Sequence, residues 1–517
     1  MRIDKLHIAS FKNLRDFSIN YDQGSLITVL VGRNGTGKSN LLEALVIIFR
    51  DLDLGEGPAF KYSINYKCRN NEIVVDADPD RAQREAYRIQ VNSEAISIRN
   101  FSGMPDRQYL PNYVFGYYSG PSNRLEQHFE KHQNKFYDEL LKGNDKALRP
   151  LLYARLAHSQ FALLAFFNEH DEAIMKFLDT QLRIQALDSV LFVMRQPPWK
   201  SRKGDARFWF ARGTVQHFLA RLLELSLAPI RLKQPVRLDF REKTSLEHLY
   251  LYLPSAEELH VLAGEYPDQQ QLFKALESTY ISKLISEVRI RVKVRGTDDT
   301  LTFRELSEGE QQLLMVLGLL RFTQEEESLF LLDEPDTHLN PAWSLQYIDF
   351  LYQVAGNPEN SHIIMTTHDP LTIAGLLRSQ VQLIQRDEVT GKITAQYPEQ
   401  DPRGMGVAGL LTSDIYGLRS QLDTETMQML DERRKLALRN DELSAEEKQH
   451  FAALDERLAS LGFTQNSRDP LYAPFVKAMT KVIEEERLTA PILTNEQQER
   501  QLELAKEIIK DLRLQRE

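Results

Sequence analysis

The sequence is poor in cysteine and has no long apolar run, and each absence excludes a class of protein. Cys68 is the single cysteine among 517 residues, so neither an internal disulfide nor a multi-thiolate zinc site can be built within the chain. No apolar run approaches the roughly 20 residues that a membrane-spanning helix needs, and the first residues lack the apolar core of a signal peptide. We therefore expect a cytoplasmic protein with no membrane association.

An excess of positive charge is also lacking. The formal net charge is −10 at pH 7, which argues against binding nucleic acid through bulk charge, although a local basic face remains open. The contents of hydrophobic residues, 42%, and charged residues, 27%, are those of a globular protein. A chain of this length is too long for one ordinary core, so we expect two or three domains.

A phosphate-binding loop follows an early apolar segment. Residues 26–31 are typical of a buried strand and residues 41–49 of an apolar helix, and between them residues 32–39 fit the pattern Gly-x-x-x-x-Gly-Lys-Ser. Lys38 should reach the β and γ phosphates of ATP, and the Ser39 hydroxyl should bind Mg²⁺. The backbone N–H groups expected to surround the phosphates are those of Asn34, Gly35, Thr36, Gly37, Lys38 and Ser39.

Two later strands are predicted to end at the same edge of a parallel sheet, where ligands bind. Residues 328–332 are typical of a buried strand, and this strand delivers Asp333 and Glu334 at its carboxyl end. Asp333 should hold Mg²⁺, and Glu334 should orient or deprotonate the attacking water. The apolar segment 361–366 leads to His368, which we expect to contact the γ phosphate.

A second anion-binding turn is predicted before the Asp333 strand. Ser307 and Gly309 open an apolar helical run, so their free N–H groups and the positive helix end face an anion. Whether they face the nucleotide of the same chain is open.

The segment 195–212 combines cations with aromatic residues. The segment contains several cations and one acid, Asp205. Exposed aromatic residues beside cations suit a nucleic-acid backbone with stacked bases. Alternatively, the aromatic residues belong to a core, and the cations form a solvated rim or a protein interface. The candidate contact residues are Arg195, Lys200, Arg202, Lys203 and Arg207, and the interleaved aromatic residues are Trp199, Phe208, Trp209 and Phe210. Arg124 or Gln127 is expected either to sense the γ phosphate or to lie on a capped surface helix.

The order of these patterns predicts an α/β fold with four regions. Residues 1–124 and 231–400 are expected to form the two parts of an ATPase head. Residues 125–230 carry helical apolar spacing and are expected to form a helical insertion. Residues 401–517 are expected to form a helical module for docking or oligomerisation, because two charged helices are predicted at 423–439 and 446–461 and a last one at 495–514.

The motifs resemble those of ABC-type ATPases. Residues 32–39, 306–310 and 331–335 look like the Walker A, signature and Walker B motifs, and Asp336 and His368 look like the D-loop and H-loop residues. In that superfamily two heads enclose two nucleotides, so the resemblance implies a homodimer in which Ser307 acts on the partner's nucleotide. The long insertion and the opening pattern at residues 8–14 resemble the branch that contains the RecF, SMC, zinc-hook and OLD proteins.

The chain departs from several members of that branch. It lacks the Cys-x-x-Cys of the zinc-hook proteins and the acidic cluster of the OLD nucleases. What remains resembles stand-alone anti-phage defence ATPases, such as the ATPase subunit of Septu systems. This resemblance implies a sensor or regulatory subunit, higher oligomers, and a separate HNH-type effector nuclease. The alternative is a RecF-like repair ATPase that binds DNA in an ATP-dependent way; a transporter ATPase would not carry so long an insertion.

Overall fold

The computed structural model describes most of the chain. The described residues are 1–104, 107–144, 149–167, 172–237, 243–296, 300–322, 327–354, 360–439, 443–462, 475, 478–479, 482 and 495–514. They form two compact units: Met1–Ile373 with Ser379–Tyr397, and Ala374–Arg378 with Pro398–Glu517. We refer to these as the first unit and the second unit.

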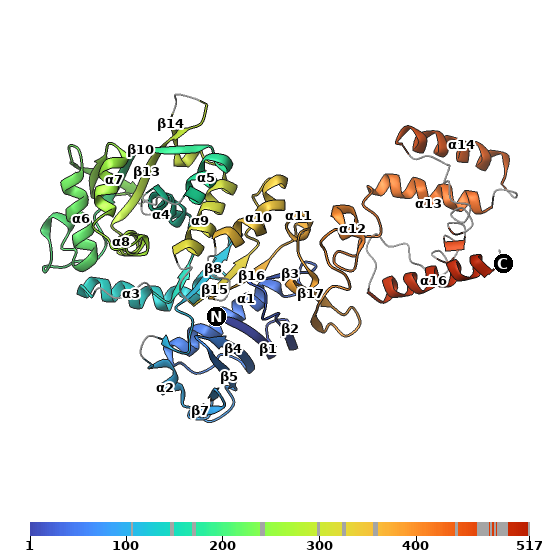
Figure 1. Ribbon diagram of the computed structural model, residues 1–517, viewed down its shortest axis with the longest axis horizontal. Helices are drawn as coiled ribbons and strands as arrows, with labels where there is room; N and C mark the ends of the chain where they lie inside the picture. The colour runs from blue at the N-terminus through green and yellow to red at the C-terminus, as the bar shows by residue number, and fades with distance from the viewer. Residues whose placement is uncertain are drawn as a thin grey trace. The chain divides into compact units, whose positions relative to one another are not determined.

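A seven-stranded sheet lies in the first unit, with the order β18-β17-β3-β16-β15-β8-β9 (Figure 1). Neighbouring strands are parallel except for β17 and β18. Strands β3, β15 and β16 are buried at every position, as expected for parallel strands that are covered on both faces. The strands are β3 (Ile27–Val31), β8 (Tyr113–Tyr118), β9 (Leu151–Tyr153), β15 (Ser328–Asp333), β16 (Ser361–Thr366), β17 (Val381–Arg386) and β18 (Ile393–Gln396).

Helix α1 (Lys38–Leu54) lies between this sheet and a second one. The second sheet is antiparallel and has the order β2-β1-β4-β5-β6-β7. One hydrophobic core joins Leu6 and Ile64 of this sheet, Leu45 and Phe49 of α1, and Ile364 of β16. The new elements are β1 (Arg2–Phe11), β2 (Leu14–Asn20), β4 (Tyr62–Cys68), β5 (Asn71–Ala77), β6 (Tyr87–Val91), β7 (Glu94–Ile96) and the short helix α2 (Ile98–Ser102).

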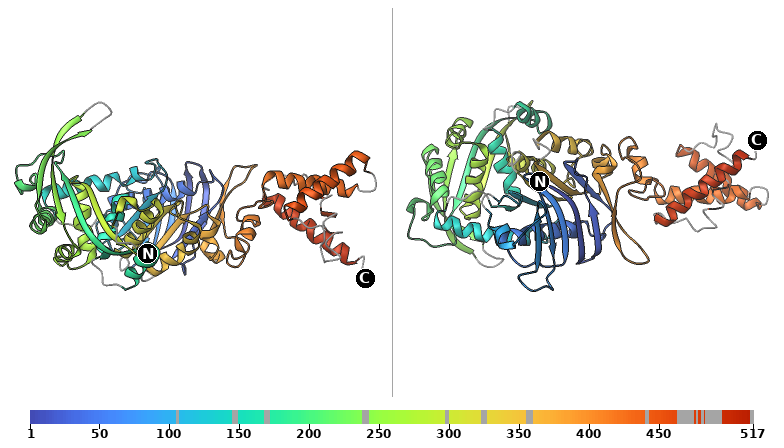
Figure 2. Two further views of the ribbon diagram at one scale, coloured as in Figure 1. Left: turned by 90° about the horizontal axis from the view of Figure 1, so that it is seen from above. Right: turned by 60° about the horizontal axis from the view of Figure 1, so that its bottom comes forward.

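A third sheet is antiparallel and has the order β11-β12-β10-β13-β14. Its strands are β10 (Ile184–Arg195), β11 (Ile230–Arg237), β12 (Lys243–Leu253), β13 (Ile285–Val294) and β14 (Thr300–Thr302). Helices α6 (Gly213–Leu225), α7 (Ala256–Ala263) and α8 (Gln269–Ile281) contact it, and Figure 2 shows its long strands alongside these helices.

Further helices tie the third sheet to the seven-stranded one. Helix α4 (Leu156–Phe167) packs against α8 and against α9 (Glu308–Phe322), and α9 in turn packs against α10 (Pro341–Val354). The other helices of this unit are α3 (Glu130–Lys142), α5 (Glu172–Gln181) and α11 (Pro370–Ile373).

The segment 125–230 differs from the helical insertion that we expected. It contains β9, the 12-residue strand β10 and the first residue of β11, in addition to α3, α4, α5 and α6. Strand β10 pairs with β12 and β13, both of which lie more than 45 residues further along the chain. This segment is therefore one part of a mixed α/β subdomain that also uses residues 243–302.

The second unit is helical in its described part. It contains α12 (Gly406–Thr412), α13 (Thr424–Leu438), α14 (Ala445–Ser460) and α16 (Asn495–Leu514). Helices α13 and α14 contact each other through Met429, Leu436, Leu454 and Leu458. The contact-based boundary lies at Pro398, close to the expected residue 401.

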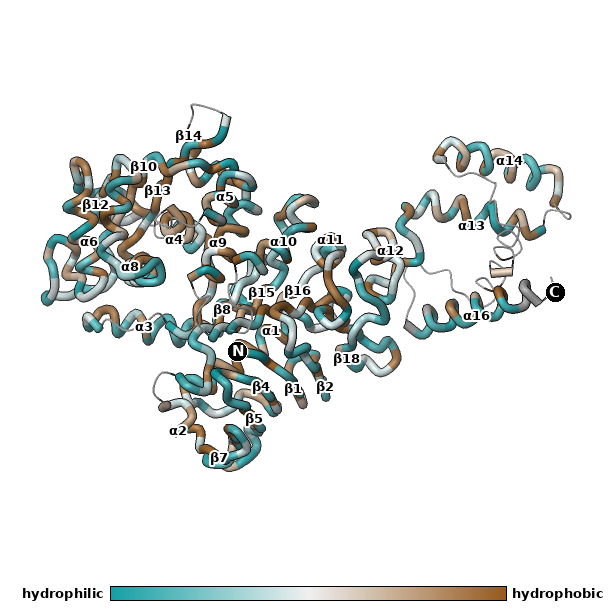
Figure 3. Tube along the Cα trace, viewed as in Figure 1, coloured by the Kyte–Doolittle hydropathy of each residue, from teal (hydrophilic) through white to brown (hydrophobic). Residues whose placement is uncertain are grey.

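Figure 3 shows that apolar residues are concentrated along the central strands β15 and β16, whereas α16 is mainly hydrophilic. Among the described residues, no helix is both long enough and apolar enough to cross a membrane.

Candidate functional site

The phosphate loop joins β3 to α1. Gly35 and Gly37 have φ values of +81° and +96°, which glycine adopts without the strain that a side chain would bring. Gly37 also needs the space, because a Cβ there would lie 2.9 Å from Asn13 Oδ1. Asn13 Nδ2 donates to the Gly35 carbonyl at 3.0 Å, and Asn40 Nδ2 donates to Asn13 Oδ1 at 2.6 Å. The loop is therefore held from outside by two amide side chains.

Lys38 folds back over the loop. Its Nζ donates to the carbonyl oxygens of Gly32 at 2.7 Å and Arg33 at 3.3 Å, and the side chain is buried. Burial lowers the pKa of Lys38 to about 8, although Glu334 and Asp333 oppose this shift. A buried ammonium group inside a glycine-rich loop fits the phosphates of a nucleotide, and the nearby hydroxyl and carboxylate oxygens of Ser39 and Asp333 are the ligands that Mg²⁺ prefers.

Strand β15 carries Asp333 to the edge of the sheet, next to β16. The Thr366 hydroxyl at the end of β16 donates to Asp333 Oδ1 at 2.7 Å. The same hydroxyl oxygen accepts the N–H of Glu334 at 3.0 Å. Glu334 has φ +54°, a left-handed conformation that costs free energy for a residue with a side chain. Thr366 therefore fixes the turn that carries Asp333 and Glu334.

Glu334 and His368 face each other, with His368 Nε2 3.5 Å from Glu334 Oε1. Burial, with a contribution from Asp333, raises the pKa of Glu334, while Lys38 opposes the rise. Burial and Lys38 lower the pKa of His368, while Asp333 opposes the fall. A carboxylate with a raised pKa beside a neutral imidazole is an arrangement that accepts and relays a proton.

Asp336 is buried below this edge. Its Oδ2 accepts hydrogen bonds from the hydroxyls of Thr367 at 2.5 Å and Thr372 at 2.6 Å. Burial raises the pKa of Asp336 to about 6, although both hydroxyls oppose the rise. Asp336 therefore braces the segment after Glu334 against the segment after β16, and its side chain does not face solvent.

The predicted signature turn opens α9. Ser307 is exposed, and the carboxylate of Glu310 accepts both its backbone N–H at 2.6 Å and its hydroxyl at 2.9 Å. Gly309 is required by close approach, since a Cβ there would lie 2.4 Å from the His338 carbonyl oxygen. The signature turn is thus packed against the segment that follows Asp336, and Ser307 remains on the surface.

The strand order brings together the residues predicted from three distant motifs. Lys38 interacts electrostatically with Asp333 and Glu334, and Glu334 contacts His368. Three contributors were not identified from the sequence: Thr366, Asn13 and Asn40. The sequence signal for Thr366 is the polar pair Thr366-Thr367 that ends an apolar strand. Arg124 donates to Asn40 Oδ1 at 2.5 Å, and Gln127 donates to the Arg124 carbonyl at 2.9 Å.

The segment 195–212 has its aromatic residues mostly engaged in packing. Phe208 is fully buried, and the indole N–H groups of Trp199 and Trp209 donate to the Ser282 carbonyl and to Glu247 Oε2, both at 2.9 Å. Arg207 is paired with Asp205. Lys200, Arg202 and Lys203 are exposed and Arg195 is half-buried.

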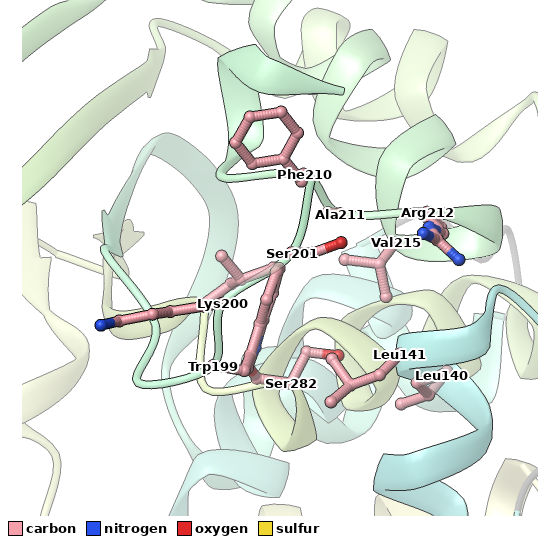
Figure 4. Close-up of a pocket in the computed structure, with 11 residues that line it drawn as sticks. Leu140, Leu141, Trp199, Lys200, Ser201, Phe210, Ala211, Arg212, Val215 and Ser282 are labelled. Carbon is pink, nitrogen blue, oxygen red and sulfur yellow. The ribbon is translucent and has the colours of Figure 1, made fainter. Parts of the chain in front are cut away.

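Trp199 also lines a cavity of about 110 Å³ between this segment, α3 and α6 (Figure 4). In Figure 4 the Lys200 side chain points away from the other lining residues, and it is exposed. These contacts favour the interpretation in which the aromatic residues are packed and the cations form a rim.

Two protein-family models match the first unit. The model described as "AAA ATPase domain" matches residues 1–188, and the model described as "AAA domain, putative AbiEii toxin, Type IV TA system" matches residues 200–374. Among curated proteins, the Septu protein PtuA of Bacillus mycoides (strain KBAB4) is 26% identical over 211 residues. That match covers 39% of this chain and only 29% of the length of PtuA.

Solved structures with detectable similarity include an Smc head bound to the C-winged helix domain of ScpA. It is 13% identical, with a TM-score of 0.34 over 77% of this chain and 98% of that chain. The ATP-binding cassette MJ1267 of an ABC transporter is 10% identical, with a TM-score of 0.28 over 80% of this chain and 99% of that chain. The fold is assigned from the strand order of the seven-stranded sheet and from the phosphate loop between β3 and α1.

The strand order, the phosphate loop and the family models define the class: the chain has an α/β P-loop fold and matches two ATPase-domain models of the AAA type, so the predicted α/β fold class is confirmed. Within that class it is related to the Septu protein PtuA.

Proposed function

We propose that the protein hydrolyses ATP at a site that a second copy of the chain completes, and that its nucleotide state controls a separate effector nuclease in anti-phage defence. The observation that carries the first part is the meeting of Lys38, Asp333, Glu334 and His368 at one sheet edge. The relation to the Septu protein PtuA supports the second part.

In this proposal the phosphate loop binds the nucleotide through residues 34–39. Lys38 leaves its own loop carbonyls and donates to the β and γ phosphates. Ser39 and Asp333 hold Mg²⁺, and Thr366 fixes the carboxylate of Asp333 for that task. When bound, Mg²⁺ neutralises charge that develops on the phosphates.

Glu334 accepts the proton of the attacking water at its carboxylate. Its raised pKa makes the carboxylate a stronger base than an ordinary glutamate. The neutral His368 contacts the γ phosphate and limits the positions that the Glu334 side chain adopts. Asp336 has a positioning role, because its carboxylate is buried between two threonine hydroxyls.

Ser307 and Gly309 contact the nucleotide of the second copy. Ser307 is exposed at the start of α9, where the helix N-terminus attracts an anion. Within one chain, the Glu310 carboxylate accepts hydrogen bonds from the Ser307 hydroxyl and N–H. This carboxylate is displaced when the phosphate of the partner's nucleotide binds Ser307. The Glu334→Gln variant should bind ATP and accumulate as a head-to-head dimer.

The partner part of the proposal is tested by purifying the tagged protein with its neighbouring genes and with ATP present. A second polypeptide in stoichiometric amount, of the HNH nuclease kind, is the expected result. The second polypeptide should show no nuclease activity when ATP is present. It should become active when it is co-purified with the Lys38→Ala variant of this chain, whereas the control variant Lys5→Ala, at an exposed lysine, should behave as wild type. Equal nuclease activity in all three preparations contradicts gating, and a homodimer that binds DNA only with ATP favours a RecF-like role.

A further inference from the structure

The third sheet has one face turned to its helices and one face that the ATPase site does not use. Successive residues of a strand point to opposite faces. On β12 and β13, Leu251 and Ile290 are fully buried, whereas the neighbouring Tyr252, Arg289 and Arg291 are exposed. We call the second face the outer face. Its apolar and aromatic members are Leu191, Ile230, Leu232, Tyr250 and Tyr252, together with the buried Val193 and His248, and its cations are Arg195, Arg289, Arg291 and Lys293.

Strand register places these side chains in rows across the sheet. Tyr252 lies opposite Leu191, and Leu191 lies opposite Arg289. One row away, Ile230 lies opposite Tyr250 on β12. Opposed residues on one face are close enough for their side chains to touch. Both tyrosines therefore lie beside apolar residues. On the β13 side the Tyr252 row ends at Arg289, and the Tyr250 row continues through Val193 to Glu287.

Three apolar or aromatic side chains of the outer face are exposed. The exposed fractions are 51% for Ile230, 48% for Leu232 and 36% for Tyr252. Strand β11 is the edge strand, so its two apolar side chains extend the strip to the rim of the sheet. An exposed apolar strip of this kind marks a binding surface.

The charge of the outer face is opposite to that of the whole chain. The chain has a net charge of −10, whereas the outer face carries four cations and the one carboxylate that register places among them is Glu287. Glu287 accepts two hydrogen bonds from Arg289, at 2.9 and 3.0 Å, and contacts Arg304 at 2.6 Å. Two arginines thus share one acid.

Two further cations on the outer face are not neutralised in this way. Within the described part of the chain, neither Arg291 nor Lys293 forms an ion pair. Arg291 is near Glu305, whose carboxylate is bonded to Thr302 in a capping box. The β13 side of the outer face therefore attracts anions.

We propose that the outer face of the third sheet binds single-stranded nucleic acid, with bases stacked on Tyr250 and Tyr252 and phosphates held by Arg291 and Lys293. An open antiparallel sheet that presents aromatic rings between cations is suited to unpaired bases, because every base offers a flat face for stacking. A duplex hides those base faces, so it should bind more weakly.

The inference does not depend on the proposed ATPase function, because its test needs neither ATP nor a second subunit. The full chain is titrated into fluorescently labelled 20-nucleotide oligo(dT) and oligo(U), and anisotropy is recorded from 50 to 200 mM salt. A 20-base-pair duplex serves as the comparison. Binding of the single strands, tighter than binding of the duplex, is the expected result.

Two variants identify the face. Arg291→Gln/Lys293→Gln should weaken binding about tenfold and reduce the salt slope by about 1.4, which corresponds to two lost phosphate contacts on a single strand. Tyr252→Ala should weaken binding about tenfold through lost stacking, while Tyr252→Phe should retain it. Lys5→Gln, which changes an exposed lysine on β1, should bind as the unaltered chain does. Melting temperature and ATP binding establish that each variant is folded.

The proposal is overturned if the unaltered chain does not bind either oligonucleotide at 50 mM salt. It is also overturned if folded Arg291→Gln/Lys293→Gln and Tyr252→Ala bind as tightly as Lys5→Gln. Loss of a co-purifying protein from these variants, with oligonucleotide binding unchanged, would show instead that the outer face is a protein interface.

Discussion

At the scale of single residues, the proposed role of Lys38 predicts that nucleotide binding depends on pH. Burial lowers its pKa to about 8, so the free protein loses this positive charge as the pH rises through 8. Phosphate anions favour the protonated amine and raise the pKa again. ATP binding should therefore weaken between pH 7 and pH 9 and should take up a proton at pH 8.5.

Calorimetry at pH 8.5 in two buffers of different ionisation enthalpy measures the proton uptake directly. A Lys38→Arg variant that still binds ATP should lose the pH dependence, because the guanidinium stays charged. An affinity for ATP that is constant from pH 7 to pH 9, with no proton uptake, would contradict this role of Lys38.

Thr366 is predicted to act as a positioning residue for hydrolysis. Its hydroxyl bonds both Asp333 and the N–H of Glu334, and Thr366→Val removes both bonds with little change in shape. We expect kcat to fall roughly 10–100-fold, as for other residues that orient ligands and bases, with little change in KM. Thr366→Ser keeps the hydroxyl and should retain activity. An unchanged kcat for Thr366→Val in a phosphate-release assay would refute the assignment.

Residues of contiguous motifs, such as Lys38 and Asp333, could be predicted as site residues, because a short pattern specifies their local geometry. Thr366, Asn13 and Asn40 depend on which strands become neighbours. No local pattern contains that information, and a threonine after an apolar strand has many ordinary roles.

At the scale of elements, strand β10 likewise could not be predicted from its own sequence. Its apolar residues suit a helix or a strand when the segment is read alone. Backbone pairing with β12 and β13 makes the segment a strand. The sequences of these two strands lie far downstream. By contrast, β3 and α1 could be predicted together, since the glycine-rich loop between them defines where one ends and the other begins.

Helices α4 and α8 are joined by a buried ionic cluster. Glu277 on α8 contacts Arg149 at 2.9 Å and His158 on α4 at 2.8 Å, and all three are buried. Burial opposes ionisation of Glu277, but His158 and Arg149 outweigh it and hold the pKa of Glu277 at about 2. Replacing Glu277 by Leu leaves Arg149 buried without its partner and should cost about 3–5 kcal/mol of unfolding free energy.

Urea unfolding followed by tryptophan fluorescence measures that cost. The double variant Glu277→Leu/Arg149→Met removes both charges and should be more stable than the single variant. A loss below about 1 kcal/mol for Glu277→Leu would show that Arg149 finds water or another partner.

At the scale of the whole molecule, the chain adds two parts to the sheet that carries the phosphate loop. One is the third sheet with its helices, inserted between the phosphate loop and the signature turn. The other is the helical second unit. The motifs predicted the head, and the fold class is confirmed. The third sheet was not predicted, because its strands come from segments that flank α6, α7 and α8.

In the proposed mechanism, two copies of the chain share each hydrolysis site. Phosphate release by a heterodimer of Glu334→Gln and Ser307→Arg, co-expressed with different tags and purified through both, tests this directly. Each variant alone should bind ATP and be inactive. The heterodimer contains one site with an intact Glu334 from one copy and an intact Ser307 from the other, so it should regain up to about half of the wild-type rate per dimer. A purified heterodimer as inactive as its parents, or a Ser307→Arg protein that no longer binds ATP, would contradict the shared site.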